Sequence, residues 1–310
     1  SCQSYRIVGN GGYHYRTEGS YNIIQNSIAK LLHPEPLGGH GFGSRNGPNN
    51  TFNNCEATGI TYPFYCRWPD SAYNTFNNCT VYEKNGLVVR DGAHHNTFNN
   101  CKVVNGDYGI GFFDTTEEGQ NDPCAYDNTF NNCTFYNIGA GVFHLSVVTG
   151  NYASTVQNNK FINCSVSDAL YMFKDAMPSS GNEIINCIFE DVTSSWLDPN
   201  NTGTAYPLNF SFDYCNLYNT PAWPANPDTS NIMELPPIFQ DKATGDLHLR
   251  ASSPCIDAGT ATNAPSTDFE GDSRPMGNAV DMGADETPYT QSDVFYVSLT
   301  GNDTNTGTSE

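Results

Sequence analysis

One set of basic and acidic residues recurs at the same place after successive apolar runs, and it is the part of the chain best suited to chemistry. The aligned residues are Arg67, Arg90, Phe113, His144 and Lys174, with Asp91 directly after Arg90 and Asp175 directly after Lys174. A basic side chain beside a carboxylate can act as a general base or acid, and clustered carboxylates can hydrolyse glycosidic bonds. The same pairs could equally be neutralised surface ion pairs, which contribute little to stability. If successive runs stack in line, these residues form a groove matched to an extended chain such as a polysaccharide.

A short acidic turn is the candidate metal site. It contains Asp268, Glu270 and Asp272. Ca²⁺ prefers several carboxylate and carbonyl oxygens, so the turn could take a calcium ion, although it does not match the twelve-residue calcium loop. A solvated acidic turn is the alternative, and the sequence indicates no other cofactor.

Asparagines followed by any residue and then Ser or Thr are candidate glycosylation sites in a secreted protein. Asn49, Asn200, Asn209 and Asn302 fit this pattern and could carry sugar. Asn78, Asn132 and Asn163 fit it too, but they lie in a repeated slot that we expect to be buried, so they should stay bare.

The elements that would position all these residues follow from one phrase, Asn-Thr-Phe-Asn-Asn-Cys. It occurs four times, at Asn50–Cys55, Asn74–Cys79, Asn96–Cys101 and Asn128–Cys133, and weaker copies start at residues 22, 159 and 182. The copies begin 28, 24, 22, 32, 31 and 23 residues apart. A period of this size indicates a solenoid. Short strands separated by bends predict an all-β parallel β-helix with three strands per turn and about eight or more turns.

Two positions of the phrase should form columns along the solenoid. The second Asn tolerates left-handed backbone at a bend, and its amide can bond the same amide one turn away. This predicted ladder comprises Asn54, Asn78, Asn100, Asn132, Asn163 and Asn186. The predicted column of buried, unpaired thiols comprises Cys55, Cys79, Cys101, Cys133, Cys164, Cys187 and Cys215. Buried thiols of this kind behave as small hydrophobes.

Four cysteines fall outside the column. They are Cys2, Cys66, Cys124 and Cys255. We expect these four to be better disulfide candidates than the column thiols, with a pairing that sequence cannot assign.

The repeats resemble the right-handed parallel β-helix, or pectin-lyase-like, superfamily. The segments Asp246–Gly259, Asp268–Pro275 and Val280–Glu286 resemble the closing segment of secreted bacterial β-helix proteins of the choice-of-anchor type. The resemblance implies a solenoid body over residues 1–220, a closing segment over 221–290 and an extracellular location. It does not fix activity, because the superfamily includes lyases, hydrolases, adhesins and structural proteins. Its lyases use Arg or Lys as the base, often with Ca²⁺.

Residues 291–310 are out of order. This stretch resembles the strand that normally begins such proteins, yet here it follows the closing segment. Its apolar part is Val294, Phe295, Tyr296 and Val297. Strand addition to an open solenoid edge, near residues 5–11 of another copy, would explain the order. A tandem array, a circular permutation or a strand folded back on its own body are the alternatives.

Composition limits the partners. The chain has 310 residues, with 33 acidic against 13 basic ones and a formal net charge of −20. This charge disfavours binding to nucleic acid or to an anionic membrane surface. No apolar stretch approaches the roughly 18 residues of a membrane span.

We therefore expect a secreted or cell-surface structural protein that joins copies of itself head to tail into a filament or sheath. The alternatives are a secreted polysaccharide lyase, or less favourably a glycoside hydrolase, and a glycan-binding adhesin that uses the same groove. The sequence leaves enzymatic activity undecided and leans against it.

Overall fold

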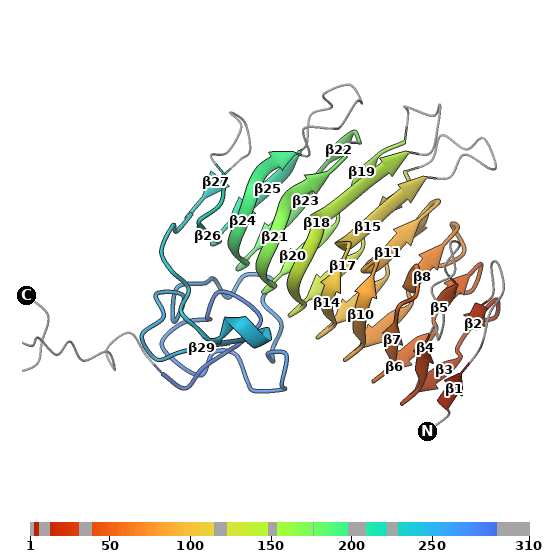
Figure 1. Ribbon diagram of the computed structural model, residues 1–310, viewed down its shortest axis with the longest axis horizontal. Coiled ribbons are helices and arrows are strands. Elements are labelled where there is room, and N and C mark those ends of the chain that lie inside the picture. The colour runs from red at the N-terminus through yellow and green to blue at the C-terminus, as the bar shows by residue number, and fades with distance from the viewer. Residues whose placement is uncertain are drawn as a thin grey trace, which may run out of the picture.

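The computed structural model describes residues 3–5, 13–30, 39–114, 123–147, 154–175, 177–197, 209–221 and 229–289. Successive turns of the chain stack along one axis, and each turn adds strands to the same faces (Figure 1). The all-β parallel β-helix predicted from the repeats is confirmed. Among the described residues, no helix is long and apolar enough to cross a membrane.

Two large parallel sheets form the body, with two small ones beside them. The nine-stranded sheet contains β3 (Ile23–Gln25), β6 (Thr51–Asn53), β9 (Thr75–Asn77), β13 (Thr97–Asn99), β17 (Thr129–Asn131), β20 (Lys160–Ile162), β23 (Asn182–Ile185), β25 (Phe210–Asp213) and β27 (Thr229–Ser230). The first limb of the fourteen-stranded sheet contains β1 (Gln3–Tyr5), β4 (Ile28–Lys30), β7 (Glu56–Thr58), β10 (Thr80–Lys84), β14 (Lys102–Gly106) and β26 (Asn216–Tyr218). Its second limb contains β2 (Tyr13–Thr17), β5 (His40–Arg45), β8 (Tyr62–Arg67), β11 (Leu87–Arg90) and β15 (Tyr108–Asp114). The long strands β18 (Thr134–Val147), β21 (Ser165–Lys174) and β24 (Ile188–Leu197) run through both limbs. The small sheets are β12 (Ala93–His94), β16 (Ala125–Tyr126), β19 (Val156–Gln157) and β22 (Ser179–Ser180), and the antiparallel pair β28 (Phe239–Asp241) and β29 (Asp246–Leu249), which flank the short helix η1 (Lys242–Thr244).

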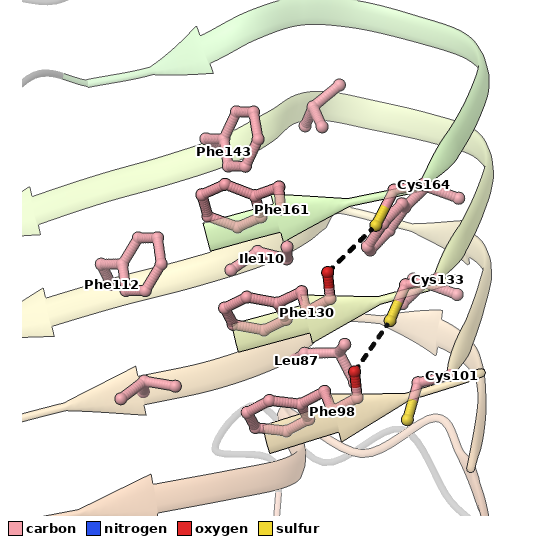
Figure 2. Close-up of a cluster of buried hydrophobic side chains, with 14 of the residues drawn as sticks. Leu87, Phe98, Cys101, Ile110, Phe112, Phe130, Cys133, Phe143, Phe161 and Cys164 are labelled. Atoms are coloured by element: carbon pink, nitrogen blue, oxygen red, sulfur yellow. Dashed lines mark hydrogen bonds between the residues drawn. The ribbon is translucent and has the colours of Figure 1, made fainter. Parts of the chain in front are cut away.

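Identical residues of successive repeats pair with each other. Phe76 of β9 lies opposite Phe98 of β13, and Phe98 lies opposite Phe130 of β17. Their rings stack inside the solenoid with centroids 4.6 and 4.8 Å apart and planes within 6° of parallel. Figure 2 shows Phe98 and Phe130 of this stack. The stack is fully buried, and aliphatic residues of the second limb pack against it. Aromatic and aliphatic burial of this kind is the main favourable contribution to folding.

The cysteine column is also as predicted. All seven column thiols are buried and unpaired. Each Sγ lies close to the carbonyl oxygen of the residue at the repeat Phe position one turn earlier, as for Cys133 and Phe98 at 3.6 Å and Cys164 and Phe130 at 3.5 Å (Figure 2). That residue is isoleucine for Cys55 and Cys215. The thiols therefore act as small core residues that also make weak hydrogen bonds.

The disulfide expectation is wrong for the three other cysteines in the described part of the chain. Cys66, Cys124 and Cys255 are free and buried, and Cys2 lies outside the described residues. Cys66 faces the core beside Val89, the Cys124 thiol lies 3.5 Å from the Met177 sulfur, and Cys255 packs in the apolar cluster between residues 231–289 and Ile188 of the body. Burial raises the pKa of the Cys66 and Cys124 thiols, so they stay protonated at neutral pH.

Three asparagine ladders run along the solenoid where one was predicted. The predicted ladder exists, with amide bonds such as Asn78 to Asn54 and Asn100 to Asn78 at 3.2 Å, but Asn54 and Asn78 are exposed rather than buried. Its members adopt left-handed backbone, with φ between 51° and 54°, at the outer corner of each turn. The left-handed conformation is required at the bend between strands. This bend faces away from the core at Asn54 and Asn78, so their side chains are exposed.

The buried ladder uses the first Asn of each phrase. It comprises Asn22, Asn50, Asn74, Asn96, Asn128, Asn159 and Asn182. Each amide oxygen accepts both the backbone N–H and the side-chain N–H of the preceding member, as Asn96 does from Asn74 at 3.0 Å. A third ladder joins Asn53, Asn77, Asn99 and Asn131 on the outer face of the nine-stranded sheet. The buried ladder satisfies polar groups that would otherwise be unpaired in the core.

The closing segment, here residues 231–289, folds back against the later turns (Figure 1, blue). Its small apolar cluster includes Phe239, Leu247 and Met282 and packs against Ile188 of the body. Its backbone carbonyls also accept hydrogen bonds from ladder amides, such as Asn132 to Thr267 at 2.8 Å and Asn186 to Thr260 at 2.8 Å. The closing segment therefore covers one side of the solenoid.

We predict that Asn96→Ala destabilises the protein by about 2–4 kcal/mol, because it leaves the Asn74 N–H and the Ser71 carbonyl buried without partners. The matched control Asn99→Ala, in the solvent-facing ladder of the same turn, should cost under about 1 kcal/mol. Urea unfolding of both variants measures the difference. Equal losses would contradict a special role for the buried ladder.

Candidate functional site

The residues aligned in the sequence (Arg67, Arg90, Phe113, His144 and Lys174) are called the basic stripe here. Its first two members form a compact ion cluster on the outer face of the second limb. Arg67 and Arg90 lie side by side on β8 and β11, as the sequence alignment required. Both guanidinium groups donate through Nε to the same Oδ2 of Asp91, at 2.7 and 3.0 Å, and all three side chains are at most 10% exposed. The two cations are fixed by one carboxylate, so neither is positioned to take a proton as a free base.

The second half of the predicted stripe is wrong in its alignment. Phe113 follows Arg90 in register, but the next residue in that column is Ser146. His144 pairs with Gly111 and Lys174, one outward position earlier along the strands. Strands β15 and β18 pair with Ile110 opposite Phe143, two residues away from the register that the alignment of Phe113 with His144 assumed.

His144 does form a pair with one of the predicted carboxylates. Its Nε2 lies 2.9 Å from Asp175 Oδ2, and this hydrogen bond lowers the pKa of Asp175. The sequence suggested that Asp175 pairs with the adjacent Lys174. In the structure, the hydrogen-bond partner of Asp175 is His144 from the preceding turn.

Aromatic rings that the sequence did not single out connect the two polar pairs. The Arg90 guanidinium lies 5.2 Å from the Tyr62 ring, and the Phe113 ring lies 5.0 Å from His144 and 5.4 Å from Tyr108. Gly111 leaves the room these rings need, since a Cβ there would come within 2.7 Å of both Phe113 and Tyr108. The rings make a small second core on the outside of the sheet, so this face is built for rigidity more than for proton transfer. Tyrosines recur in the apolar runs of the sequence, and this recurrence could have indicated the cluster of rings.

The acidic turn of the calcium prediction closes on itself. Asp268 is fully buried, and its Oδ1 accepts the backbone N–H groups of Glu270, Gly271 and Asp272 at 2.8–2.9 Å. Its Oδ2 accepts the N–H of Glu286 at 3.1 Å. These bonds occupy the carboxylate oxygens that a calcium ion would need, so Asp268 stabilises the turn instead.

A different trio comes together nearby. The ligand atoms of His248, Glu270 and Asp285 lie within 4.8 Å of one another, a convergence that sequence reasoning missed. His248 already contacts Asp246 through Nδ1 and Glu270 through Nε2, and Asp285 accepts the Leu249 N–H at 2.7 Å. Burial opposes protonation of His248, but the neighbouring carboxylates Asp246, Asp285 and Glu270 together outweigh it and raise the histidine pKa. The polar atoms of the trio thus already have hydrogen-bonding and ionic partners within the closing segment.

The closing segment also buries a salt bridge. Arg274 Nη1 lies 2.7 Å from Glu286 Oε2, and both side chains are at most 1% exposed. Asp281 is fully buried beside them and accepts the N–H groups of Asp257 and Thr287. Burial raises the pKa of Asp281 to about 7.

A groove of about 550 Å³ runs along the outer edge of the nine-stranded sheet. Two solvent-facing asparagine ladders form its floor, and residues 265–267 of the closing segment form a wall. Its lining residues are Gln25, Asn53, Asn54, Asn77, Asn78, Asn99, Asn100, Asn131, Asn132, Pro265, Ser266 and Thr267. The predicted ladder residues are therefore a surface as well as a structural device.

The nine-stranded sheet has an exposed edge at β3. Strands β1 and β2 pair with β4 and β5, whereas the nine-stranded sheet ends at β3 in the described part of the chain. Ile23 on this edge strand is 68% exposed, and Tyr21 just before the strand is 79% exposed. Among the described residues, no strand pairs with the outer edge of β3.

Several predicted residues give no further site. Asn49 is half-buried and Asn209 is exposed, while Asn200, Asn302 and the predicted joining strand Val294–Val297 lie outside the described residues. Residues 6–11 of the predicted acceptor edge lie outside them too.

Comparison with known proteins identifies the family. The model of the right-handed β-helix region matches residues 5–172 and 70–220, which together cover more than half of the chain. The chain therefore belongs to the right-handed β-helix family, and the predicted handedness is confirmed. No curated protein matches it significantly. A similar solved structure is a trypsin-treated variant of QnrB1, a plasmid-mediated fluoroquinolone resistance protein, with 12% identity, a TM-score of 0.20, and coverage of 70% of this chain and 91% of that one. A TM-score this low supports no statement about function.

We predict a pH dependence of stability from Asp281. Its folded pKa of about 7 lies above its usual value of 3.8, so its contribution is fully present below about pH 4 and is lost as the pH rises through 7. The stability of the wild type relative to Asp281→Asn should therefore fall between pH 4.5 and pH 7.5, by up to about 1.4 kcal/mol per pH unit. Urea unfolding of both proteins at the two pH values measures this. A difference independent of pH would contradict the assignment.

Proposed function

We propose that the chain is an extracellular structural subunit that joins other copies head to tail by adding a strand at its open N-terminal end. The observation that carries the proposal is the exposed edge of β3. This strand pairs with β6 on one side, and no strand in the described part of the chain pairs with its other side. An unprotected edge of this kind presents unpaired backbone groups and readily pairs with another strand.

The side chains at this end also suit an added strand. Ile24 lies at the end of the apolar stack and is only partly buried. In the ladders, the Oδ1 of Asn22 receives no hydrogen bond from the described residues, and the Nδ2 of Asn26 donates none to them. An incoming strand would thus find an apolar surface flanked by one free acceptor and one free donor. The segment Val294–Val297 has the apolar, β-branched and aromatic composition of such a strand.

The extracellular setting rests on the resemblance of the closing segment to secreted β-helix proteins. The strongly acidic charge supports solubility of a repeated assembly. A contact of this kind between unlike surfaces produces a filament if it does not close into a ring.

The lyase alternative receives less support from the described geometry. A lyase of the predicted type needs a cationic side chain free to accept a proton, and Arg67 and Arg90 are both held by Asp91. The His144–Asp175 pair lies beside buried rings and is not among the residues that line the asparagine groove. We therefore do not assign an activity.

We predict that the 310-residue chain forms concentration-dependent oligomers or filaments, visible by light scattering after gel filtration and by electron microscopy. Deletion of residues 291–310 should leave monomers, and Ile24→Asp should weaken association at least tenfold by placing a charge at the acceptor edge. Ile238→Asp, which changes a partly exposed isoleucine of the closing segment, is the matched control and should assemble normally.

Two outcomes would refute the proposal. One is a wild-type chain that stays monomeric at all concentrations. The other is assembly that persists in both the deletion variant and Ile24→Asp.

A further inference from the structure

We propose that the groove over the two exposed asparagine ladders binds a neutral, hydroxyl-rich oligosaccharide lying along the solenoid axis. The groove crosses five successive turns, from Gln25 to Asn131. At a strand spacing of about 4.8 Å, the floor is roughly 19 Å long, which suits a short polymer segment more than a single small molecule. This inference is independent of head-to-tail assembly.

The fold alone does not require the amides of one ladder. Asn53, Asn77, Asn99 and Asn131 sit on strands, where asparagine is disfavoured. In the next two turns the same column carries Ile162 and Ile185, which are 4% and 7% exposed. The column is therefore isoleucine where the neighbouring Asn163 and Asn186 contact the closing segment, and asparagine where the surface is open. The strand tolerates either residue, so the amides suit the open surface.

Among the described residues, the inner ladder members use half of their side-chain hydrogen-bonding capacity on each other. Asn77 donates one N–H to Asn53 and accepts one from Asn99, at 2.8 and 2.9 Å. An amide has two N–H donors and two lone pairs, so one of each remains for a ligand. The next ladder repeats this arrangement, as Asn78 donates to Asn54 and accepts from Asn100 at 3.2 Å. The floor thus offers alternating donors and acceptors at every turn, the pattern that pairs with sugar hydroxyl groups.

The ladders also fix the amides before any ligand arrives. The inner members, such as Asn77 and Asn99, are held by neighbours on both sides, so binding would cost little side-chain entropy. A rigid scaffold of stacked strands holds the whole array at a constant spacing. Preorganisation of this kind favours binding of a regular polymer over an irregular one.

The absence of charge in the lining points to a neutral ligand. All twelve lining residues are uncharged, although the chain carries a net charge of −20. An anionic sugar would have no cation to pair with there, and a metal ion would find amides without a carboxylate. The wall formed by Pro265, Ser266 and Thr267 makes the surface concave, which suits a single chain better than a flat crystal face.

The test is calorimetric titration of the full chain with cellohexaose, xylohexaose, mannohexaose and chitohexaose, with hexagalacturonate as the anionic comparison. At least one neutral hexasaccharide should bind with a Kd below about 1 mM, and hexagalacturonate should bind at least tenfold more weakly. The double variant Asn77→Ile, Asn99→Ile should weaken binding at least tenfold. Isoleucine already occupies this column at residues 162 and 185, so this variant is expected to fold, and circular dichroism checks it.

The matched control is Asn105→Ala, Asn137→Ala. It removes another exposed amide pair, bonded at 2.8 Å outside the groove, and it should bind like the wild type. The proposal is overturned if no neutral hexasaccharide binds at millimolar concentration, if hexagalacturonate binds as well as the neutral sugars, or if the Asn77, Asn99 variant binds unchanged.

Discussion

In-register hydrogen bonding between successive turns is the constraint on which the rest of the structure depends. Because each strand pairs with its counterpart one turn away, equivalent residues must lie directly above each other. The repeated Phe therefore becomes a ring stack, the repeated Cys a thiol column and the repeated Asn a ladder. The variable spacing of the copies is absorbed between strands, so inserted residues do not disturb the register.

The ladders have a direction, and the direction differs between inside and outside. The buried amides donate toward the C-terminal end, as Asn74 does to Asn96, whereas the exposed amides donate toward the N-terminal end, as Asn78 does to Asn54. The opposed directions partly cancel the amide dipoles of neighbouring ladders. Within the described part of the chain, they also leave the Asn22 acceptor and the Asn26 donor together beside β3, at the edge proposed to accept an added strand.

The closing segment determines which parts of the solenoid remain available for binding. Its backbone carbonyls accept hydrogen bonds from the side-chain amides of Asn132, Asn163 and Asn186, so the outer ladder becomes buried at the later turns. Over the earlier turns the same ladder stays open and gains a wall at residues 265–267. Asparagines at one position of the repeat therefore hold the closing segment against the later turns and line the groove over the earlier turns.

The sequence by itself determined the solenoid, the inward Phe and Cys columns and the existence of an amide ladder, because these follow from local pattern repeated at each turn. It also placed Arg67 and Arg90 in line. The tertiary structure decided the rest: Ser146 rather than His144 follows Phe113, Asp268 binds its own loop, Cys66 and Cys124 stay unpaired, and Thr267 meets Asn132. The first of these outcomes follows from the register of β15 with β18, and the last from a contact between residues 135 positions apart. No local repeat encodes such contacts, since they arise only when the closing segment folds onto the assembled turns.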